Sequence, residues 1–354
     1  MGEKGFLPRK FHYNLEGEAV SRKPPGLILV WAAMAKLVGV GLAAIVFPLL
    51  ALGVLFLFYL VTGRFFASRA LRLAAVLLLA GMPVFLLRSH AYSPTMLNLA
   101  VFLGMLLSFD LLLDRGDRRY YFLTGILAGL LIWIRPTSAL LWIPPLFCLV
   151  RERKKLRPVR LLWLVVPAAA VIILFLVYNK MIFGNFFATG YSVYHMDPGD
   201  RTAAAGIKGF FAIIQFRPRI WLVHLISAPL AFTLAFPPLR IGLIGYYLLF
   251  KEGFSRRWIW LGGLTLVILL LFFSNFETYG FYSRELNLRS SFLRYCLPGL
   301  VFLATPTAYF LSRLRKFFSA ALALVLTFNI LVALFAPLVL IQTAFLGESY
   351  RRAR

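Results

Sequence analysis

Two carboxylates near the N-terminus are the side chains best suited to acid or base chemistry. Glu16 and Glu18 lie shortly before Arg22–Gly26 and the apolar segment that follows it. At a membrane surface, such a carboxylate could accept a proton from a substrate hydroxyl. The same stretch could instead be a solvated lead-in to a helix, and the spacing alone leaves both interpretations open.

Three arginines at the ends of apolar runs could hold an anion: Arg88, Arg135 and Arg294. A guanidinium beside hydrocarbon is costly unless it meets an anion or a wet cavity, and it binds phosphate through charge-assisted hydrogen bonds. Alternatives remain for two of them. Arg88 could extend to the membrane interface, and Arg294 could pair with Glu277 or Glu285.

A long polar loop brings together residues that can hydrogen-bond a hydroxyl-rich ligand. Asn179, Asn185 and Tyr191 are such residues. Loops favour these residue types in any protein, so the motif alone is a weak indication. The four His residues show no metal-site spacing. The sequence identifies no cofactor; a divalent cation is possible, but no ligand set in the sequence supports one.

Membrane helices are the elements that must position these residues. Hydrophobic residues make up 61% of the chain and charged residues only 14%, against roughly 25% charged in soluble domains. An apolar run of about 20 residues crosses the bilayer core and must be helical there. The sequence predicts an all-α, polytopic membrane protein of about ten transmembrane helices, at 40–62, 71–87, 95–113, 120–134, 138–150, 161–178, 230–250, 258–273, 292–311 and 317–345.

The distribution of basic residues predicts topology rather than nucleic-acid binding. The net charge is +25, which in a soluble protein would suggest a nucleic-acid partner. Here the lysines and arginines fall between the apolar runs, so we expect the lipid bilayer as partner and no nucleic acid. They crowd into short connections that should be cytoplasmic, namely 64–72, 115–119, 151–160, 251–257 and 313–316. The longer loops should lie outside.

Taken in order, these features resemble the GT-C membrane glycosyltransferases. They are similar in particular to the protein O-mannosyltransferases (glycosyltransferase family 39) and to related bacterial and archaeal polyprenyl-phosphate-sugar transferases. The resemblance rests on Arg22–Gly26 before a short helix, on Gly125–Pro136, on Tyr178–Tyr191 and on Arg294–Pro298. Each motif is degenerate, so the specificity lies in their order.

The resemblance implies transfer of a sugar from a polyprenyl-phosphate-linked donor, at the extracytoplasmic face of a prokaryotic cell membrane. The acceptor and the sugar are not indicated. Carried onto this sequence, the family's roles make Glu18 or Glu16 the base. The cations for the donor phosphate are Arg135, Arg294 and Arg88. The residues near the sugar or acceptor are Asn179, Asn185 and Tyr191.

The N-terminal part departs from the family's pattern. Family members begin with a transmembrane helix followed by an Asp, whereas this sequence begins within what should be the next loop. We therefore expect a partial first extracytoplasmic loop at 1–25, a multi-pass transmembrane domain at 26–346 and a basic C-terminal tail at 347–354. Without that Asp the chain could be inactive. The alternative function is a non-enzymatic transporter or scaffold for lipid-linked saccharides.

Overall fold

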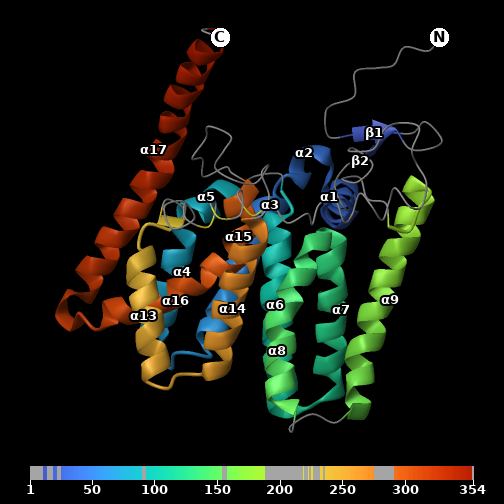
Figure 1. Ribbon diagram of the computed structural model, residues 1–354, viewed down its shortest axis with the longest axis horizontal. Coiled ribbons are helices and arrows are strands. Elements are labelled where there is room, and N and C mark those ends of the chain that lie inside the picture. The colour runs from blue at the N-terminus through green and yellow to red at the C-terminus, as the bar shows by residue number, and fades with distance from the viewer. Residues whose placement is uncertain are drawn as a thin grey trace. The chain divides into compact units, whose positions relative to one another are not determined.

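The computed structural model confirms the multi-pass helical class (Figure 1). It describes residues 11–13, 19–21, 25–89, 93–153, 158–187, 232–233, 236–274 and 291–352, together with 218, 222 and 225. The chain forms two compact units. Unit 1 comprises residues 1–46, 108–139 and 154–216, and unit 2 comprises 47–107, 140–153 and 217–354.

Unit 1 contains a small hairpin and a set of helices. Strands β1 and β2 pair antiparallel, with His12 opposite Val20. The end of α6 also belongs to this unit. The complete elements are β1 (Phe11–Tyr13), β2 (Ala19–Ser21), α1 (Pro25–Val38), α2 (Val40–Ala43), α7 (Arg118–Ile134) and α9 (Pro158–Phe183).

Helices α7 and α9 pack in close parallel contact through two glycines. A Cβ atom at Gly125 would overlap the carbonyl oxygen of Leu164, and one at Gly129 would lie 2.6 Å from the Cβ of Val171. Further along, the Trp133 Nε1 donates to the Val171 carbonyl at 2.7 Å. Gly125 and Gly129 therefore have a packing role, because only the missing side chains allow this approach.

Unit 2 holds the remaining helices. Its N-terminal half contains α3 (Val46–Thr62), α4 (Arg69–Ala80), α5 (Pro83–Ser89), the beginning of α6 (Thr95–Arg115) and α8 (Ile143–Arg151). The 3-10 helix η1 (Pro136–Trp142) precedes α8. The C-terminal half contains α13 (Leu239–Lys251), α14 (Arg256–Phe273), α15 (Ser291–Leu300), η4 (Val301–Leu303), α16 (Ala304–Ser312), η5 (Arg315–Phe317) and α17 (Phe318–Arg352).

The span formed by α15, η4 and α16 lies at the centre of unit 2. Its residues from Leu297 to Tyr309 are all buried. Helix α13 crosses it at Gly245, where a Cβ atom would overlap the carbonyl oxygen of Pro306. Helix α14 approaches it at Gly299, where a Cβ atom would lie 2.6 Å from the Cα of Leu266. Glycines therefore set the closest contacts of this unit as well.

Five segments among the described residues are long and apolar enough to cross a membrane. They are Thr95–Arg115, Pro158–Phe183, Arg256–Phe273, Leu293–Ser312 and Arg315–Phe335. A sixth arises if α4 and α5, which meet at a 70° bend, count as one span. The count of ten remains a prediction.

Two predicted spans are interrupted in the structure. The run at 71–87 bends between α4 and α5 because Pro83 has no N–H to continue the helix. The run at 40–62 divides into α2 and α3 at Ala44 and Ile45. Both interruptions lie within continuously apolar sequence, so hydropathy does not reveal them.

Candidate functional site

In unit 1, Arg135 lies at the point where α7 ends. Its backbone is extended (φ −163°, ψ 113°), as expected for a residue before proline. Its N–H donates to the Leu131 carbonyl at 2.9 Å, and its carbonyl accepts from the Ser138 N–H at 2.8 Å. The side chain is only 6% exposed and its Nε atom is buried. A permanent cation is thus held inside the protein at a helix end.

The start of α1 packs against this same corner. A Cβ atom at Gly26 would lie 3.0 Å from the Cα of Ile134, the residue before Arg135. Pro25 and Leu27 are buried beside it. The fold therefore brings the end of the Arg22–Gly26 motif to Arg135, although the two are far apart in sequence. Glu16 and Glu18, the predicted base candidates, lie outside the described residues.

The end of α9 carries the two asparagines of the predicted sugar site. Asn179 is buried, and its Nδ2 donates to the Phe186 carbonyl at 3.3 Å. The Asn185 Oδ1 accepts from the Phe187 N–H at 3.0 Å. Gly184 precedes this turn with a φ of +74°, which favours glycine. Both amides thus order the turn that follows α9.

Arg135 and these asparagines belong to the same end of the α7–α9 pair. The rings of Trp133 and Tyr178 lie 6.1 Å apart; Trp133 precedes Arg135 by two residues, and Tyr178 directly precedes Asn179. The structure thus brings part of the predicted set together in unit 1. Tyr191, the third predicted sugar or acceptor contact, lies outside the described residues.

In unit 2, the other two predicted arginines lie on helices that contact each other. Arg88 is in the last turn of α5 and Arg294 in the first turn of α15, and α5 packs against α15. The Nε atoms of both are buried. The Arg294 guanidinium lies 5.1 Å from the Tyr295 ring centre, and Tyr295 stacks on Phe273 at 4.5 Å. The proposed alternative partners of Arg294, Glu277 and Glu285, are outside the described residues.

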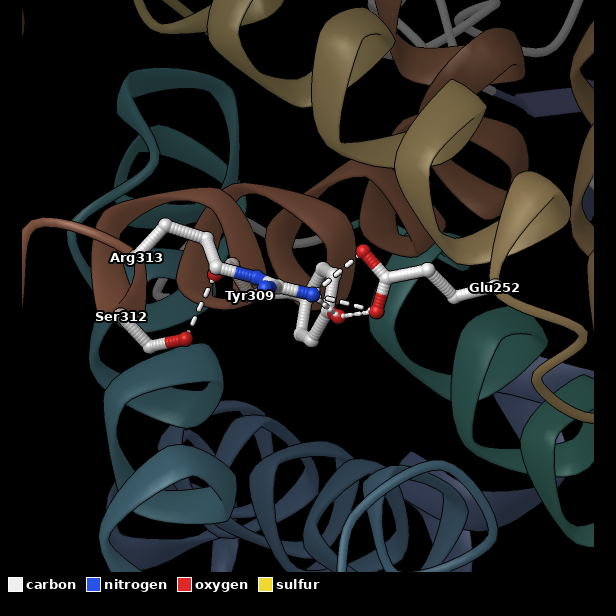
Figure 2. Close-up of polar contacts among 4 residues, drawn as sticks. All are labelled: Glu252, Tyr309, Ser312 and Arg313. Atoms are coloured by element: carbon white, nitrogen blue, oxygen red, sulfur yellow. Dashed lines mark hydrogen bonds and ion pairs between the residues drawn. The ribbon is translucent and has the colours of Figure 1, made fainter.

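A polar cluster that sequence analysis did not predict joins α16 to the turn after α13 (Figure 2). The Tyr309 hydroxyl donates to the Glu252 carboxylate, and the Arg313 Nη2 donates to both Glu252 and Tyr309. The Ser312 hydroxyl donates to the Tyr309 carbonyl at 2.6 Å. From the sequence, Arg313 is predicted only to lie in a short cytoplasmic connection. No sequence spacing signals a contact between positions 252 and 309.

This Glu252–Tyr309–Arg313 cluster is suited to a structural role. The Tyr309 ring stacks on Phe66 at 6.0 Å and meets Phe254 edge-on at 5.0 Å. The pKa of Arg313 is raised above its ordinary value, mainly by its hydrogen bond with Tyr309, with a smaller contribution from the charge of Glu252. Arg313 therefore remains cationic, and the charges of the cluster neutralise each other.

A second ion pair closes unit 2 at a neighbouring turn. Arg257 Nε and Nη2 donate to the two Glu152 oxygens at 2.7 and 2.8 Å. Both side chains are largely buried, so this bidentate pair ties the end of α8 to the start of α14. Within the described ranges, no three His, Cys, Asp or Glu side chains gather closely enough to hold a metal ion.

Comparisons with known proteins agree with this architecture. Residues 22–178 match the family of dolichyl-phosphate-mannose-protein mannosyltransferases. No curated protein matches the chain. ArnT from Cupriavidus metallidurans, in the apo state, is 17% identical with a TM-score of 0.55, over 85% of this chain and 51% of that one. ArnT bound to undecaprenyl phosphate is 15% identical with a TM-score of 0.58, over 94% of this chain and 62% of that one.

These matches confirm the predicted resemblance over residues 22–178 and the GT-C fold over most of the chain. The matched segment contains the α1 start, Arg88 and Arg135, whereas Asn179 and Arg294 lie beyond it. The chain spans only about half to three fifths of the ArnT chains.

Proposed function

We propose that this chain, which is similar to the mannosyltransferase family over residues 22–178 and shares the GT-C fold, is a membrane glycosyltransferase. It transfers a sugar from a polyprenyl-phosphate donor to an acceptor at the extracytoplasmic face. The solved structure of ArnT with undecaprenyl phosphate supports a donor of this class. The acceptor and the sugar are not assigned.

Arg135 is the observation that carries the proposal. It is a buried cation of a membrane protein, and such groups are retained where an anion or a polar cavity meets them. The residue before it, Ile134, contacts Gly26 at the start of α1, and Glu16 and Glu18 precede that helix in the sequence. A donor phosphate at this corner would stand within reach of both a cation and a base.

Arg88 and Arg294 are the other candidates for contact with the donor phosphate. They lie in unit 2 on packed helices, α5 and α15, and a guanidinium binds phosphate through charge-assisted hydrogen bonds. During transfer, the bond from the sugar's anomeric carbon to the phosphate oxygen breaks and negative charge grows on the leaving polyprenyl phosphate. Arginines oriented toward that oxygen lower the barrier.

The acceptor side needs a base and contacts to the sugar. Glu18 or Glu16 would take the proton of the acceptor hydroxyl as its oxygen bonds to the anomeric carbon. Asn179, Asn185 and Tyr191 would lie near the sugar or acceptor. The bonds that Asn179 and Asn185 make in the turn after α9 would pre-order that contact.

Transfer of label from radioactive polyprenyl-phosphate sugars tests the proposal directly. Membranes containing the chain should label an endogenous acceptor, and Arg294→Ala should lower the rate roughly 100-fold through loss of phosphate stabilisation. Arg256→Gln, which removes the charge of an exposed arginine in the same unit, serves as the matched control and should leave the rate unchanged. Intact transfer by Arg294→Ala would refute the role of Arg294.

The predicted base has its own test. A double substitution of Glu16 and Glu18 to glutamine should abolish transfer while leaving donor binding unchanged, because only proton removal is lost. If donor binds and moves across the bilayer but no label reaches an acceptor in the unsubstituted chain, the chain is the transporter or scaffold instead.

A further inference from the structure

Asn329 is the most deeply buried side chain of α17 within residues 318–335, where side chains are described. It is 0% exposed, whereas its neighbours Phe328 and Ile330 are 57% and 46% exposed. Helix α17 is otherwise strongly apolar and mostly exposed in its candidate span. An amide buried in such a helix costs free energy unless it is hydrogen-bonded.

The amide of Asn329 has unused hydrogen-bonding capacity. Its Oδ1 and Nδ2 atoms are both buried, and neither has a hydrogen-bond partner within the part of the chain that the structure describes. A carboxamide can donate two hydrogen bonds and accept two. The side chain therefore presents a donor and an acceptor inside the membrane region of unit 2.

Helix α17 runs beside the bend between α4 and α5. Helix α17 packs against both, and the Leu326 Cδ2 lies 3.1 Å from where a Cβ atom of Gly81 would be. Asn329 follows Leu326 by three residues and so lies on the same helix face. Figure 1 shows α17 passing α4 and α5.

The backbone at this bend has also lost part of its helical pairing. The Met82 N–H donates to the Leu79 carbonyl at 3.1 Å rather than to the Leu78 carbonyl, four residues before it. Pro83 has no N–H. The carbonyl of Leu78 thereby loses the donor that a continuous helix would supply. Breaks in transmembrane helices are stable where a neighbouring side chain or an ordered water satisfies the released groups.

We propose that Asn329 and the α4–α5 bend form a buried water site that holds α5 in place. A buried water needs two to four polar partners, which the Asn329 amide and the carbonyls ending α4 would supply. Because α5 carries Arg88 and packs on α15, Asn329 is a positioning residue for the phosphate-binding arginines. Only this last step rests on the proposed function.

Hydrogen exchange of the full chain in lipid nanodiscs tests the water site without any substrate. Asn329→Leu keeps the branched shape of the side chain but removes the amide, and should accelerate exchange of the amides from Leu79 to Ser89 about tenfold. Asn329→Ser retains a donor and acceptor and should recover part of the protection. Thr327→Val, at an exposed position on the same helix, is the control and should leave exchange unchanged.

Binding of undecaprenyl phosphate tests the positioning role separately. Asn329→Leu should weaken binding about five- to tenfold, with Asn329→Ser intermediate and Thr327→Val unchanged. If the unsubstituted chain does not bind this lipid, the proposed function fails while the exchange result still decides the water site.

Equal exchange in Asn329→Leu and the unsubstituted chain would overturn the water site. Faster exchange with unchanged lipid binding would overturn the positioning role alone. If Asn329→Leu does not assemble, Asn329→Ala removes the same polar atoms with less bulk, and both measurements apply to it with the same expected directions.

Discussion

Two helix pairs of this protein are both packed through glycine contacts, but the residues at the ends of the two pairs differ. Gly125 and Gly129 let α7 approach α9 in unit 1, and Gly242 and Gly245 let α13 approach α16 in unit 2. The α7–α9 pair ends at a buried arginine beside the start of α1. The α13–α16 pair ends at a cluster in which Glu252, Tyr309 and Arg313 satisfy one another.

This difference shows that the features that fix the helices in place are not the ones that mark a functional site. Close glycine contacts fix the relative position of two helices in either pair, so they do not mark a site by themselves. What distinguishes the ends is their exposure and their neighbours. Glu252 and Arg313 pair at the α13–α16 end and are partly solvent-exposed. Arg135 is only 6% exposed and lies beside the start of α1, within the matched segment.

The largest effect should come from breaking a glycine contact. In Gly245→Val the new side chain would overlap the Pro306 backbone, which cannot yield as a flexible side chain would. We expect a loss of about 3 kcal/mol or more of stability, seen as loss of monodisperse protein after detergent extraction. Gly263→Ala, with its nearest neighbour at 3.5 Å, should be tolerated; equal loss in both would contradict the close-contact explanation.

Gly125→Val should behave in the same way as Gly245→Val, because the overlap with the Leu164 carbonyl is of the same kind. Loss of only one of the two variants would show that the pairs do not share this packing device.

Removing Arg135 should affect activity more than folding. Arg135→Ala should lower sugar transfer roughly 100-fold, because the charge near the donor phosphate is lost. Arg135→Lys should recover only part, since an ammonium lacks the bidentate geometry. Rates are measured at saturating and limiting donor. A variant that unfolds in detergent but transfers normally in membranes would contradict this assignment.

Removing the phenolic hydroxyl from the Glu252–Tyr309–Arg313 cluster should affect stability more than activity. Tyr309→Phe keeps the ring stack on Phe66 and loses the hydrogen bonds, so we expect a fall of about 2–4 °C in Tm and unchanged transfer. Thermal unfolding followed by intrinsic fluorescence measures this change in Tm. The control is Arg119→Gln, because Arg119 forms an exposed ion pair with Asp117, and it should show no shift. A large loss of transfer would give the cluster a catalytic role.

The smallest effect is expected at the turn after α9. Asn185→Ala removes the acceptor for the Phe187 N–H, and stability should change by less than about 0.5 kcal/mol. If the amide also lies near the sugar, the KM for donor should rise about threefold with kcat little changed. A loss of transfer in Asn185→Ala as large as that in Arg135→Ala would contradict the inference that Arg135 is the more important residue.

Local features were predictable because neighbouring residues determine them. Arg135 before Pro136 must leave the helical conformation, and the helix does end there. Glycines four apart in an apolar run indicate a close contact, and α9 supplies it. The bend at Gly81–Pro83 and the division of 40–62 were missed, because apolar composition continues through both and hydropathy averages over them.

Contacts between distant segments could not be predicted in this way. Glu252 meets Tyr309 and Arg313 because α13 and α16 cross at Gly245, and no periodicity in either helix records the partner. Asn329 was counted as one residue of an apolar run, whereas its burial depends on how α17 is rotated toward α4 and α5. Rotation about a helix axis leaves the mean hydropathy unchanged.

By itself, the sequence determined three things. It showed that this is a helical membrane protein, it located the end of α7 at Arg135, and it indicated the family that the chain resembles. These follow from composition, backbone sterics and motif order, which act over a few residues at a time. Only the tertiary structure decided that the start of α1 meets the Arg135 corner, that Arg88 and Arg294 lie on packed helices, and that Asn329 is buried in a helix that packs on α4 and α5. The reason is that each depends on the approach of segments far apart in the chain, which side-chain volume and glycine contacts control.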